Sequence, residues 1–382
     1  MVHLITPGDH YSPLTGSATS TVVNGLAGAA ARTTPNMPQF VVVDAATYRP
    51  RYETADALEF AGNAPVSRRE RVADIARGAS GRARSAEAEY FGPAVEVVLR
   101  RPPSIVIAHN APIVPWLLRE SPHRVVLYAH NRLLRTFTRA EAARVLDGAA
   151  AIVCVSDSLA DRMRSDLPKR VRERVHTVGN GVDSEQFRPA QGEVYVPTPE
   201  RPFRVMFVGR MVREKGADVL VKAANSLARS DLEFVFVGSE GFDRNAPLSR
   251  HEEQLRRLVA EGSARIVFEP FVDRRALPGL MRTADMLVVP SRWPEPSGLT
   301  VGEGMATGLP VVASRIGGIP EVLGKAGRYV EPEDFRSLAA AIARLADDAS
   351  LRARIGEAAR ERAVQHDWSW SWANLSDVLR GL

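Results

Sequence analysis

The chain has 382 residues, a length that indicates two domains rather than one. Apolar residues make up 45% of it and charged residues 25%, both ordinary values for a globular protein. Its single cysteine excludes a disulfide framework or a cysteine-rich metal site within one chain. No stretch approaches the ~20 apolar residues of a membrane span, and the first apolar run is too short for a signal peptide, so we expect a cytoplasmic protein.

The basic excess is confined to the first half of the chain. Residues 1–190 contain 24 basic and 19 acidic side chains, whereas residues 191–382 contain 26 of each kind. We interpret the arginines clustered between positions 68 and 101 chiefly as a solvated helix face. Peripheral contact with an anionic membrane surface stays open as an alternative. Nucleic acid is not expected, because aromatic residues do not interleave with these arginines before Tyr90.

Short apolar runs alternate with amphipathic segments, a pattern typical of doubly wound α/β folds with parallel sheets. In the first half, strands are predicted at 2–6, 40–44, 104–108, 124–128, 151–155 and 174–178, and helices at 18–31, 66–78, 84–100, 138–147 and 157–166. In the second half, strands are predicted at 203–208, 232–237, 264–268, 285–289, 310–313 and 327–330, and helices at 215–229, 249–261, 273–283, 301–307, 333–347 and 350–365.

The proline-rich stretch 188–202 has no periodic run and is predicted to link a first domain, 1–187, to a second, 203–366. In open parallel sheets, ligands bind outside the carboxyl ends of the strands. Two such sheets that faced one another would form a cleft, so residues that follow strand ends are the candidates for binding and catalysis.

Three loops of the first half follow predicted strands and carry candidate residues. The loop after the first strand reaches Gly16 just before a helix and is a weak candidate for approaching a phosphate. Two later strands end in His109-Asn110 and His130-Asn131. A lone histidine there is usually structural, but the pair occurs twice. We expect both to face the cleft, where an imidazole can donate a hydrogen bond to a phosphate or a sugar hydroxyl.

Cations follow the first strand of the second half. It ends in Gly209-Arg210, and Lys215 comes five residues later. Arginine offers a planar fork for phosphate oxygens and lysine a compact charge. The next strand ends in Gly238. Phe271-Val272 follow a further strand and are candidates for lining a base pocket, although Phe271 is equally well explained as core.

Two carboxylates, Glu295 and Glu303, lie eight positions apart around the start of a predicted helix. The loop between strand and helix contains Pro296, Ser297 and Gly298. The first amides of a helix lack intrahelical partners and attract an anion. Glu295 is placed to hold hydroxyls of a neutral ligand and Glu303 to reach a ribose. Phosphate, ribose and sugar together indicate a sugar nucleotide.

Other catalytic patterns are absent from the sequence. It contains no Gly-x-Ser-x-Gly elbow, no Walker lysine motif and no His-Glu-x-x-His. Gly-x-Gly-x-x-Gly does not follow the first strand, which speaks against a dinucleotide cofactor.

The second half resembles family 4 of the retaining glycosyltransferases, also called glycosyl transferases group 1. The resemblance is carried by Phe207 to Gly216, by Glu295 to Glu303 and by Gly308 to Glu321. It covers residues 150–330, whereas the first 150 residues resemble the family in outline. It implies a GT-B fold of two Rossmann-like domains facing a cleft. A C-terminal helix at about 367–382, with three tryptophans as anchors, would cross back to the first domain.

The resemblance also implies roles for the candidate residues. Arg210 and Lys215 would bind the donor diphosphate, and Glu303 the ribose. Glu295 would hold hydroxyls of the transferred sugar. The implied catalytic residues are His130, Arg210, Lys215 and Glu295. The implied donor-binding residues are Gly16, Gly209, Arg210, Lys215, Gly238, Phe271, Val272, Glu295, Pro296, Ser297, Gly298, Leu299, Thr300 and Glu303. The acceptor-side candidates are His109, Asn110 and Asn131.

The predicted activity is retaining transfer of a hexose from an α-linked nucleoside-diphosphate sugar to a hydroxyl acceptor such as a glycan, glycolipid or small metabolite. UDP is the expected donor nucleotide, because the resemblance to the family implies it. No metal and no cofactor beyond the sugar-nucleotide substrate are expected. The alternatives are a UDP-sugar 2-epimerase and a non-catalytic protein that binds anionic surfaces.

Overall fold

The computed structural model describes residues 1–190 and 201–382, so most of the predicted linker, 191–200, lies outside the described residues. The chain divides into two compact units. Unit 1 comprises Met1–Pro13, Ser17–Asn180 and Trp368–Leu382, and unit 2 comprises Leu14–Gly16 and Gly181–Asp367. The main part of unit 1 thus ends at Asn180, before the predicted domain limit at residue 187. Unit 1 also includes the C-terminal segment Trp368–Leu382.

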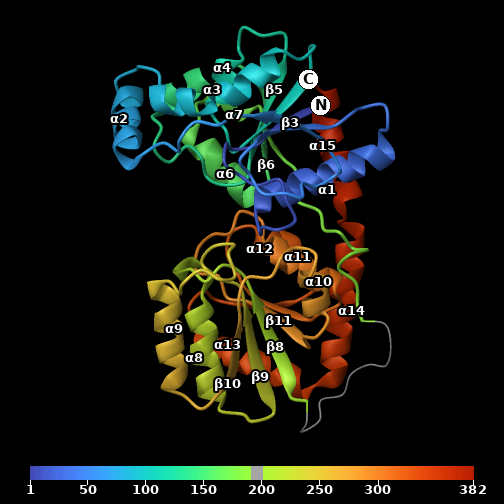
Figure 1. The fold of residues 1–382 in the computed structure, drawn as a ribbon. Helices are drawn as coiled ribbons and strands as arrows, with labels where there is room; N and C mark the ends of the chain where they lie inside the picture. The colour runs from blue at the N-terminus through green and yellow to red at the C-terminus, as the bar shows by residue number, and fades with distance from the viewer. Residues whose placement is uncertain (191–200) are drawn as a thin grey trace. The chain divides into compact units, whose positions relative to one another are not determined.

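Unit 1 is built on a seven-stranded parallel sheet in the order β3-β2-β1-β4-β5-β6-β7. Figure 1 labels β3, β5 and β6 of this sheet together with helices of the unit. Its strands are β1 Val2–Leu4, β2 Phe40–Asp44, β3 Asp56–Phe60, β4 Ile105–His109, β5 Arg124–Ala129, β6 Ala149–Cys154 and β7 Val175–Thr177. Its helices are α1 Ala18–Thr33, α2 Arg68–Ala79, α3 Ser85–Leu99, α4 Val114–Leu117, α5 Arg139–Val145, α6 Asp157–Asp166, α7 Lys169–Arg172 and α15 Trp368–Arg380. The central strands are nearly continuous buried valine, isoleucine and alanine, as in parallel sheets covered on both faces.

Unit 2 repeats the plan with six parallel strands in the order β10-β9-β8-β11-β12-β13. Its strands are β8 Phe203–Val208, β9 Leu232–Val237, β10 Arg265–Glu269, β11 Met286–Val289, β12 Val311–Ser314 and β13 Arg328–Val330. Its helices are the 3-10 turn η1 Arg213–Lys215, α8 Ala217–Leu227, α9 Arg250–Ala260, α10 Leu277–Met281, α11 Leu299–Ala306, α12 Ile319–Leu323, α13 Phe335–Asp347 and α14 Ala349–Gln365.

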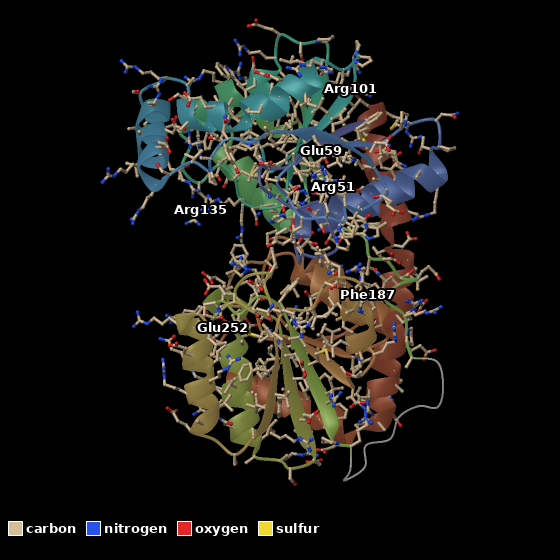
Figure 2. The ribbon with its side chains drawn as sticks, in the orientation of Figure 1. Arg51, Glu59, Arg101, Arg135, Phe187 and Glu252 are labelled. Atoms are coloured by element: carbon tan, nitrogen blue, oxygen red, sulfur yellow. The ribbon has the colours of Figure 1, made fainter. Side chains whose placement is uncertain are left out.

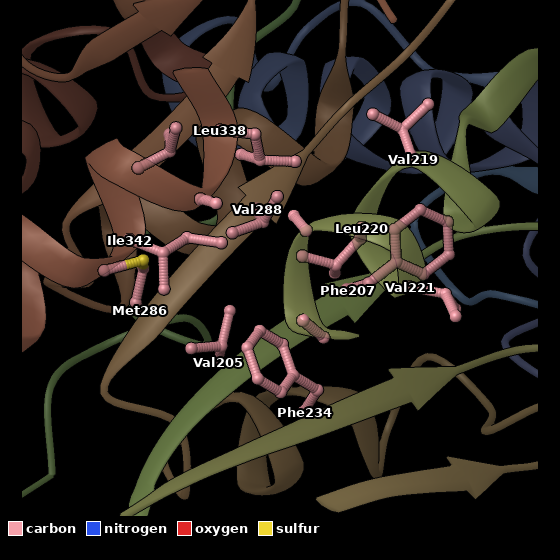
Figure 3. Packing of buried hydrophobic residues seen from close by; sticks show 14 of the residues in the cluster. Val205, Phe207, Val219, Leu220, Val221, Phe234, Met286, Val288, Leu338 and Ile342 are labelled. Carbon is pink, nitrogen blue, oxygen red and sulfur yellow. The ribbon is translucent and has the colours of Figure 1, made fainter. Parts of the chain in front are cut away.

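Alternate residues of the unit 2 strands build two cores. On one face, Phe207 and Met286 pack with Leu220 of α8 and Ile342 of α13 (Figure 3). On the other face, residues such as Leu287 pack with side chains of α11. This arrangement fixes α11, the helix that follows Glu295 and carries Glu303, firmly against the sheet.

The C-terminal helix α15 belongs to unit 1 and packs on α1. Gly25 of α1 leaves room for an indole, because a Cβ there would lie 2.1 Å from the ring of Trp368. Trp372 donates from its indole nitrogen to Thr34 Oγ1 at 3.0 Å. The tryptophans therefore anchor the helix that the sequence predicted to return to the first domain.

Among the described residues, four short elements overlap none of the predicted ones: β3, α4, α7 and α12. β3 (Asp56-Ala-Leu-Glu-Phe) is an edge strand with three exposed residues, so it lacks the apolar run of a central strand. Arg51 holds it through an ion pair with Glu59 at 3.1 Å (Figure 2). Among the described residues, no helix is long and apolar enough to cross a membrane.

The arginines between 68 and 101 do not form one uniform exposed face. Arg84 is buried and pairs with Glu141 at 2.7 Å. The guanidinium of Arg101 lies over the ring of Phe40, 4.2 Å from its centroid. Contact with an anionic membrane surface stays a prediction for the exposed remainder.

Candidate active site

An ion pair joins the two most informative predicted residues, Lys215 and Glu295. Lys215 ends η1, which follows β8, and Glu295 lies in the loop after β11. Because β8 and β11 are parallel neighbours, their carboxyl ends meet at one edge of the sheet. Lys215 Nζ donates to Glu295 Oε1 at 2.7 Å, and Ser291 Oγ donates to the same oxygen at 2.8 Å.

Two glycines allow this close approach of backbone. Gly216 has φ +72°, and a Cβ there would lie 1.9 Å from the carbonyl oxygen of Pro290. Gly317 has φ +61°, and a Cβ there would lie 2.3 Å from the carbonyl oxygen of Glu295. The next residue, Gly318, donates its N–H to that carbonyl at 2.7 Å. Only glycine fits both positions without moving the ion pair.

Part of the hydrogen-bonding capacity of the Lys215–Glu295 ion pair is unused. The Lys215 side chain is 31% exposed and that of Glu295 is 6% exposed. Among the described residues, Lys215 has no hydrogen-bond partner besides Glu295, so two of its three N–H donors are unused. Glu295 Oε2 likewise has no partner there. A cation with spare donors and a carboxylate with a spare oxygen can bind a phosphate and a hydroxyl side by side.

A second ion pair holds the other predicted carboxylate. Glu303 lies on α11 and is buried, and its Oε1 accepts from Arg274 Nη2 at 2.6 Å. Arg274 was not predicted from the sequence. It follows β10 by five residues, yet it is one of 46 arginines and stands in no recognisable spacing with Glu303.

A cavity of about 100 Å³ adjoins the second pair. The predicted residues that line it are Gly16, Gly209, Arg210, Gly238, Phe271, Val272, Thr300 and Glu303. Phe242, which the sequence did not single out, also lines it, with its ring centroid 5.5 Å from that of Phe271. Arg210 is exposed and donates from Nε to the carbonyl oxygen of Glu240 at 2.9 Å. Aromatic rings can pack against a base and a carboxylate can accept from ribose hydroxyls, so this cavity is a suitable site for a nucleoside.

The remaining donor-side predictions lie next to these groups and outside the cavity lining. Pro296 and Ser297 follow Glu295, and the Ser297 side chain is buried. Gly298 precedes α11 without a side-chain cap, and Leu299 begins the helix. The amides at this helix start are therefore available to an anion.

The candidates at the two later strand ends, His109-Asn110 and His130-Asn131, belong to unit 1, and both histidines are part of a buried histidine cluster. His109 is fully buried and bridges two other histidines: its Nε2 lies 2.9 Å from Nδ1 of His3, and its Nδ1 lies 2.8 Å from Nε2 of His130. Both of its ring nitrogens are thus engaged inside unit 1, rather than facing an open surface. His3 was not predicted, because it stands alone in a short apolar strand.

Burial sets the charge of this cluster. Loss of solvation lowers the pKa of His3 to about 4 and that of His130 to about 3, and it holds the pKa of His109 well below its ordinary range. All three imidazoles are therefore neutral at neutral pH. Asn110 adopts φ +52° and its Oδ1 accepts from the His130 backbone N–H at 2.8 Å, while Asn131 is exposed.

Known proteins resemble the chain across both units. The family model described as Glycosyl transferases group 1 matches residues 195–362, and the one described as Glycosyltransferase Family 4 matches residues 45–186. Spore coat protein SA of Bacillus subtilis (strain 168) is 31% identical over 283 residues, which are 70% of this chain and 74% of that protein. D-inositol 3-phosphate glycosyltransferase 1 of Catenulispora acidiphila is 33% identical over 251 residues, 61% of this chain and 58% of that protein.

The fold also has close counterparts among solved structures. The crystal structure of Anabaena HepE in complex with UDP and glucose matches with a TM-score of 0.74 at 17% identity, covering 100% of this chain and 99% of that chain. The two parallel-sheet units therefore have the GT-B fold. With both family models and a relative at 31% identity, the chain belongs to glycosyltransferase family 4.

Proposed function

We propose that the chain is a retaining glycosyltransferase that moves a hexose from an α-linked UDP-sugar to a hydroxyl acceptor. The observation that supports this most is the Lys215–Glu295 pair, with its unused donors and its unused carboxylate oxygen. It adjoins the start of α11, whose Thr300 and Glu303 line the aromatic cavity. Phosphate, sugar and nucleoside each have a matching group within unit 2.

Each part of the donor is assigned to one group. Lys215, Arg210 and the amides before α11 bind the diphosphate. Oε2 of Glu295 accepts hydrogen bonds from hydroxyls of the transferred sugar. Glu303, held by Arg274, accepts from the ribose hydroxyls. The rings in the cavity lining pack against the base.

These groups supply electrostatic stabilisation of the departing phosphate. As the bond between the sugar C1 and the β-phosphate oxygen lengthens, negative charge grows on that phosphate. In the proposal, Lys215 and the helix amides face that charge, with Lys215 held by Glu295 and the amides held by α11. The acceptor oxygen bonds to C1 on the face that the phosphate leaves, and the acceptor proton passes to the leaving phosphate oxygen. No protein base is required in this scheme, and no metal is part of the proposal.

Names of relatives support the substrate class. One relative is named D-inositol 3-phosphate glycosyltransferase 1, and the HepE structure is described as a complex with UDP and glucose. We therefore include UDP as the donor nucleotide and a polyol or sugar hydroxyl as the acceptor in the proposal.

Thermal unfolding with candidate donors tests the proposal. A ligand that binds only the folded state raises apparent stability, by ~2.7 kcal/mol at 100 times its dissociation constant. We expect UDP-sugars to raise the melting temperature more than GDP- or ADP-sugars, with EDTA present throughout. Free hexose serves as the control. A chain that no nucleoside diphosphate stabilises would contradict the proposed donor site.

A further inference from the structure

A chain of hydrogen bonds between side chains runs across four neighbouring strands of unit 1. Gln39 precedes β2, His3 lies on β1, His109 ends β4 and His130 follows β5. Gln39 Oε1 lies 3.2 Å from His3 Nε2. The hydrogen-bond chain continues from His3 to His109 at 2.9 Å and from His109 to His130 at 2.8 Å. In the sheet these strands are adjacent in the order β2-β1-β4-β5.

The strand register explains why these four side chains meet. His3 is aligned with Val41 on one side and with Ile107 on the other. Gln39 and His109 each lie two positions from those residues. They therefore share the face of the sheet on which His3 lies, because side chains alternate with a period of two.

The hydrogen-bond chain runs toward the carboxyl edge of the sheet. His109 is aligned with Tyr128, and His130 is two positions further along. The rings of Tyr128 and His130 are stacked with centroids 4.9 Å apart and planes 12° apart. His130 is thus held at the edge where ligands of parallel sheets bind.

Gln39 determines which nitrogen donates in each hydrogen bond of the chain. Its Nε2 donates to the carbonyl oxygen of Met37 at 2.7 Å, so its Oε1 is the atom that faces His3. An amide oxygen can only accept a hydrogen bond. His3 must therefore carry its proton on Nε2.

The remaining protons follow from neutrality. A neutral imidazole has one N–H and one lone pair, so Nδ1 of His3 accepts from Nε2–H of His109. Nδ1 of His109 in turn accepts from Nε2–H of His130. The proton of His130 is then on Nε2, and its Nδ1 is a lone pair without a hydrogen-bond partner among residues 1–190 and 201–382.

We propose that Gln39, His3 and His109 are positioning residues that fix His130 as a hydrogen-bond acceptor at Nδ1 for a substrate hydroxyl. This inference rests on the proposed glycosyl transfer. A neutral lone pair attracts a sugar hydroxyl and repels a phosphate oxygen. It therefore selects between the two partners that the sequence left open for His130, and it reverses the direction of the hydrogen bond.

The position of the protons can be measured directly. Long-range proton–nitrogen NMR spectra of ¹⁵N-histidine-labelled protein at pH 7 distinguish the two ring tautomers. The His130 signal is assigned by its absence in His130→Gln. We expect a protonated Nε2 and an unprotonated Nδ1 at His130 in the wild-type protein. A proton on Nδ1 would overturn the inference, and this result does not depend on any substitution of Gln39.

Two substitutions of Gln39 form a matched pair. In Gln39→Glu the carboxylate still accepts from His3, so we expect the His130 tautomer to be unchanged. In Gln39→Lys the ammonium donates to Nε2 of His3, so each proton shifts to the other nitrogen of its ring and His130 gains Nδ1–H. A His130 tautomer that is the same in Gln39→Lys as in the wild type would contradict the coupling of Gln39 to His130 through the hydrogen-bond chain.

Turnover separates positioning from packing. We expect kcat/KM to fall on the order of tenfold in Gln39→Lys, because a donor then replaces the acceptor of the substrate hydroxyl, and to stay within about twofold in Gln39→Glu. Equal activity of the two, with the tautomer reversed, would refute the role in substrate binding. Absence of transfer in the wild type would refute the proposed function alone, because the NMR result stands without it.

Discussion

Substitution of Lys215 by methionine removes one charge and keeps the length of the side chain. The carboxylate of its partner Glu295 is then left with the Ser291 hydroxyl as its one remaining hydrogen-bond donor among the described residues. Exposed ion pairs contribute about 0–1 kcal/mol, and breaking a buried pair costs about 3–5 kcal/mol. Lys215 is 31% and Glu295 6% exposed, so we expect a loss of about 1–3 kcal/mol in unfolding free energy.

The effect on catalysis should be larger than the effect on stability. Removing one preoriented donor to a developing oxyanion commonly lowers kcat by about 100- to 1,000-fold. We therefore expect Lys215→Met to melt a few degrees lower than the wild type and to release UDP from a UDP-sugar at least about 100-fold more slowly.

Lys222→Met is the matched control for this experiment. Its side chain is 47% exposed and lies 4.0 Å from Asp218, a surface pair expected to contribute less than about 1 kcal/mol. It should leave turnover unchanged. A folded Lys215→Met protein that turns over at a rate close to that of Lys222→Met would refute the role assigned to Lys215.

Three further predictions concern other parts of the site. Arg274→Leu should raise KM for the donor more than it lowers kcat, because it frees Glu303 from its partner; steady-state kinetics with unchanged KM would contradict this. Gly317→Ala should lower both melting temperature and activity, because its methyl group would displace the Glu295 carbonyl; a variant with wild-type values of both would show that the loop adapts. The lowered pKa values of His3 and His130 mean that unfolding takes up protons below about pH 6.5. Stability should therefore be complete above that pH and fall as the pH drops toward about 4, and melting temperatures between pH 7 and 4.5 should fall less steeply in His3→Phe.

The sequence predicted those parts of the fold and site that have a local signature. Buried parallel strands read as apolar runs, and most were placed within one or two residues. Lys215 and Glu295 were each singled out from the residues around them. Their direct ion pair was not predicted, because it depends on β8 and β11 being neighbours in the sheet, with two strands between them in the chain.

The residues that the sequence did not reveal depend on the same kind of information. His3 and Gln39 have no distinctive spacing, and their contact with His130 follows from the strand order β2-β1-β4-β5. Arg274 is hidden among many arginines, and only the fold brings it to Glu303. β3 was missed because an edge strand needs no apolar run. A single sequence reports local pattern well and strand adjacency poorly.

The stereochemistry of the first-formed product tests the central claim most directly. We would incubate the protein with the UDP-α-sugar that stabilises it, with or without an acceptor alcohol, and follow the anomeric proton by NMR from the first minutes. The account predicts that the α configuration appears first and that Lys215→Met slows its appearance. A product that forms initially in the β configuration would contradict retaining transfer.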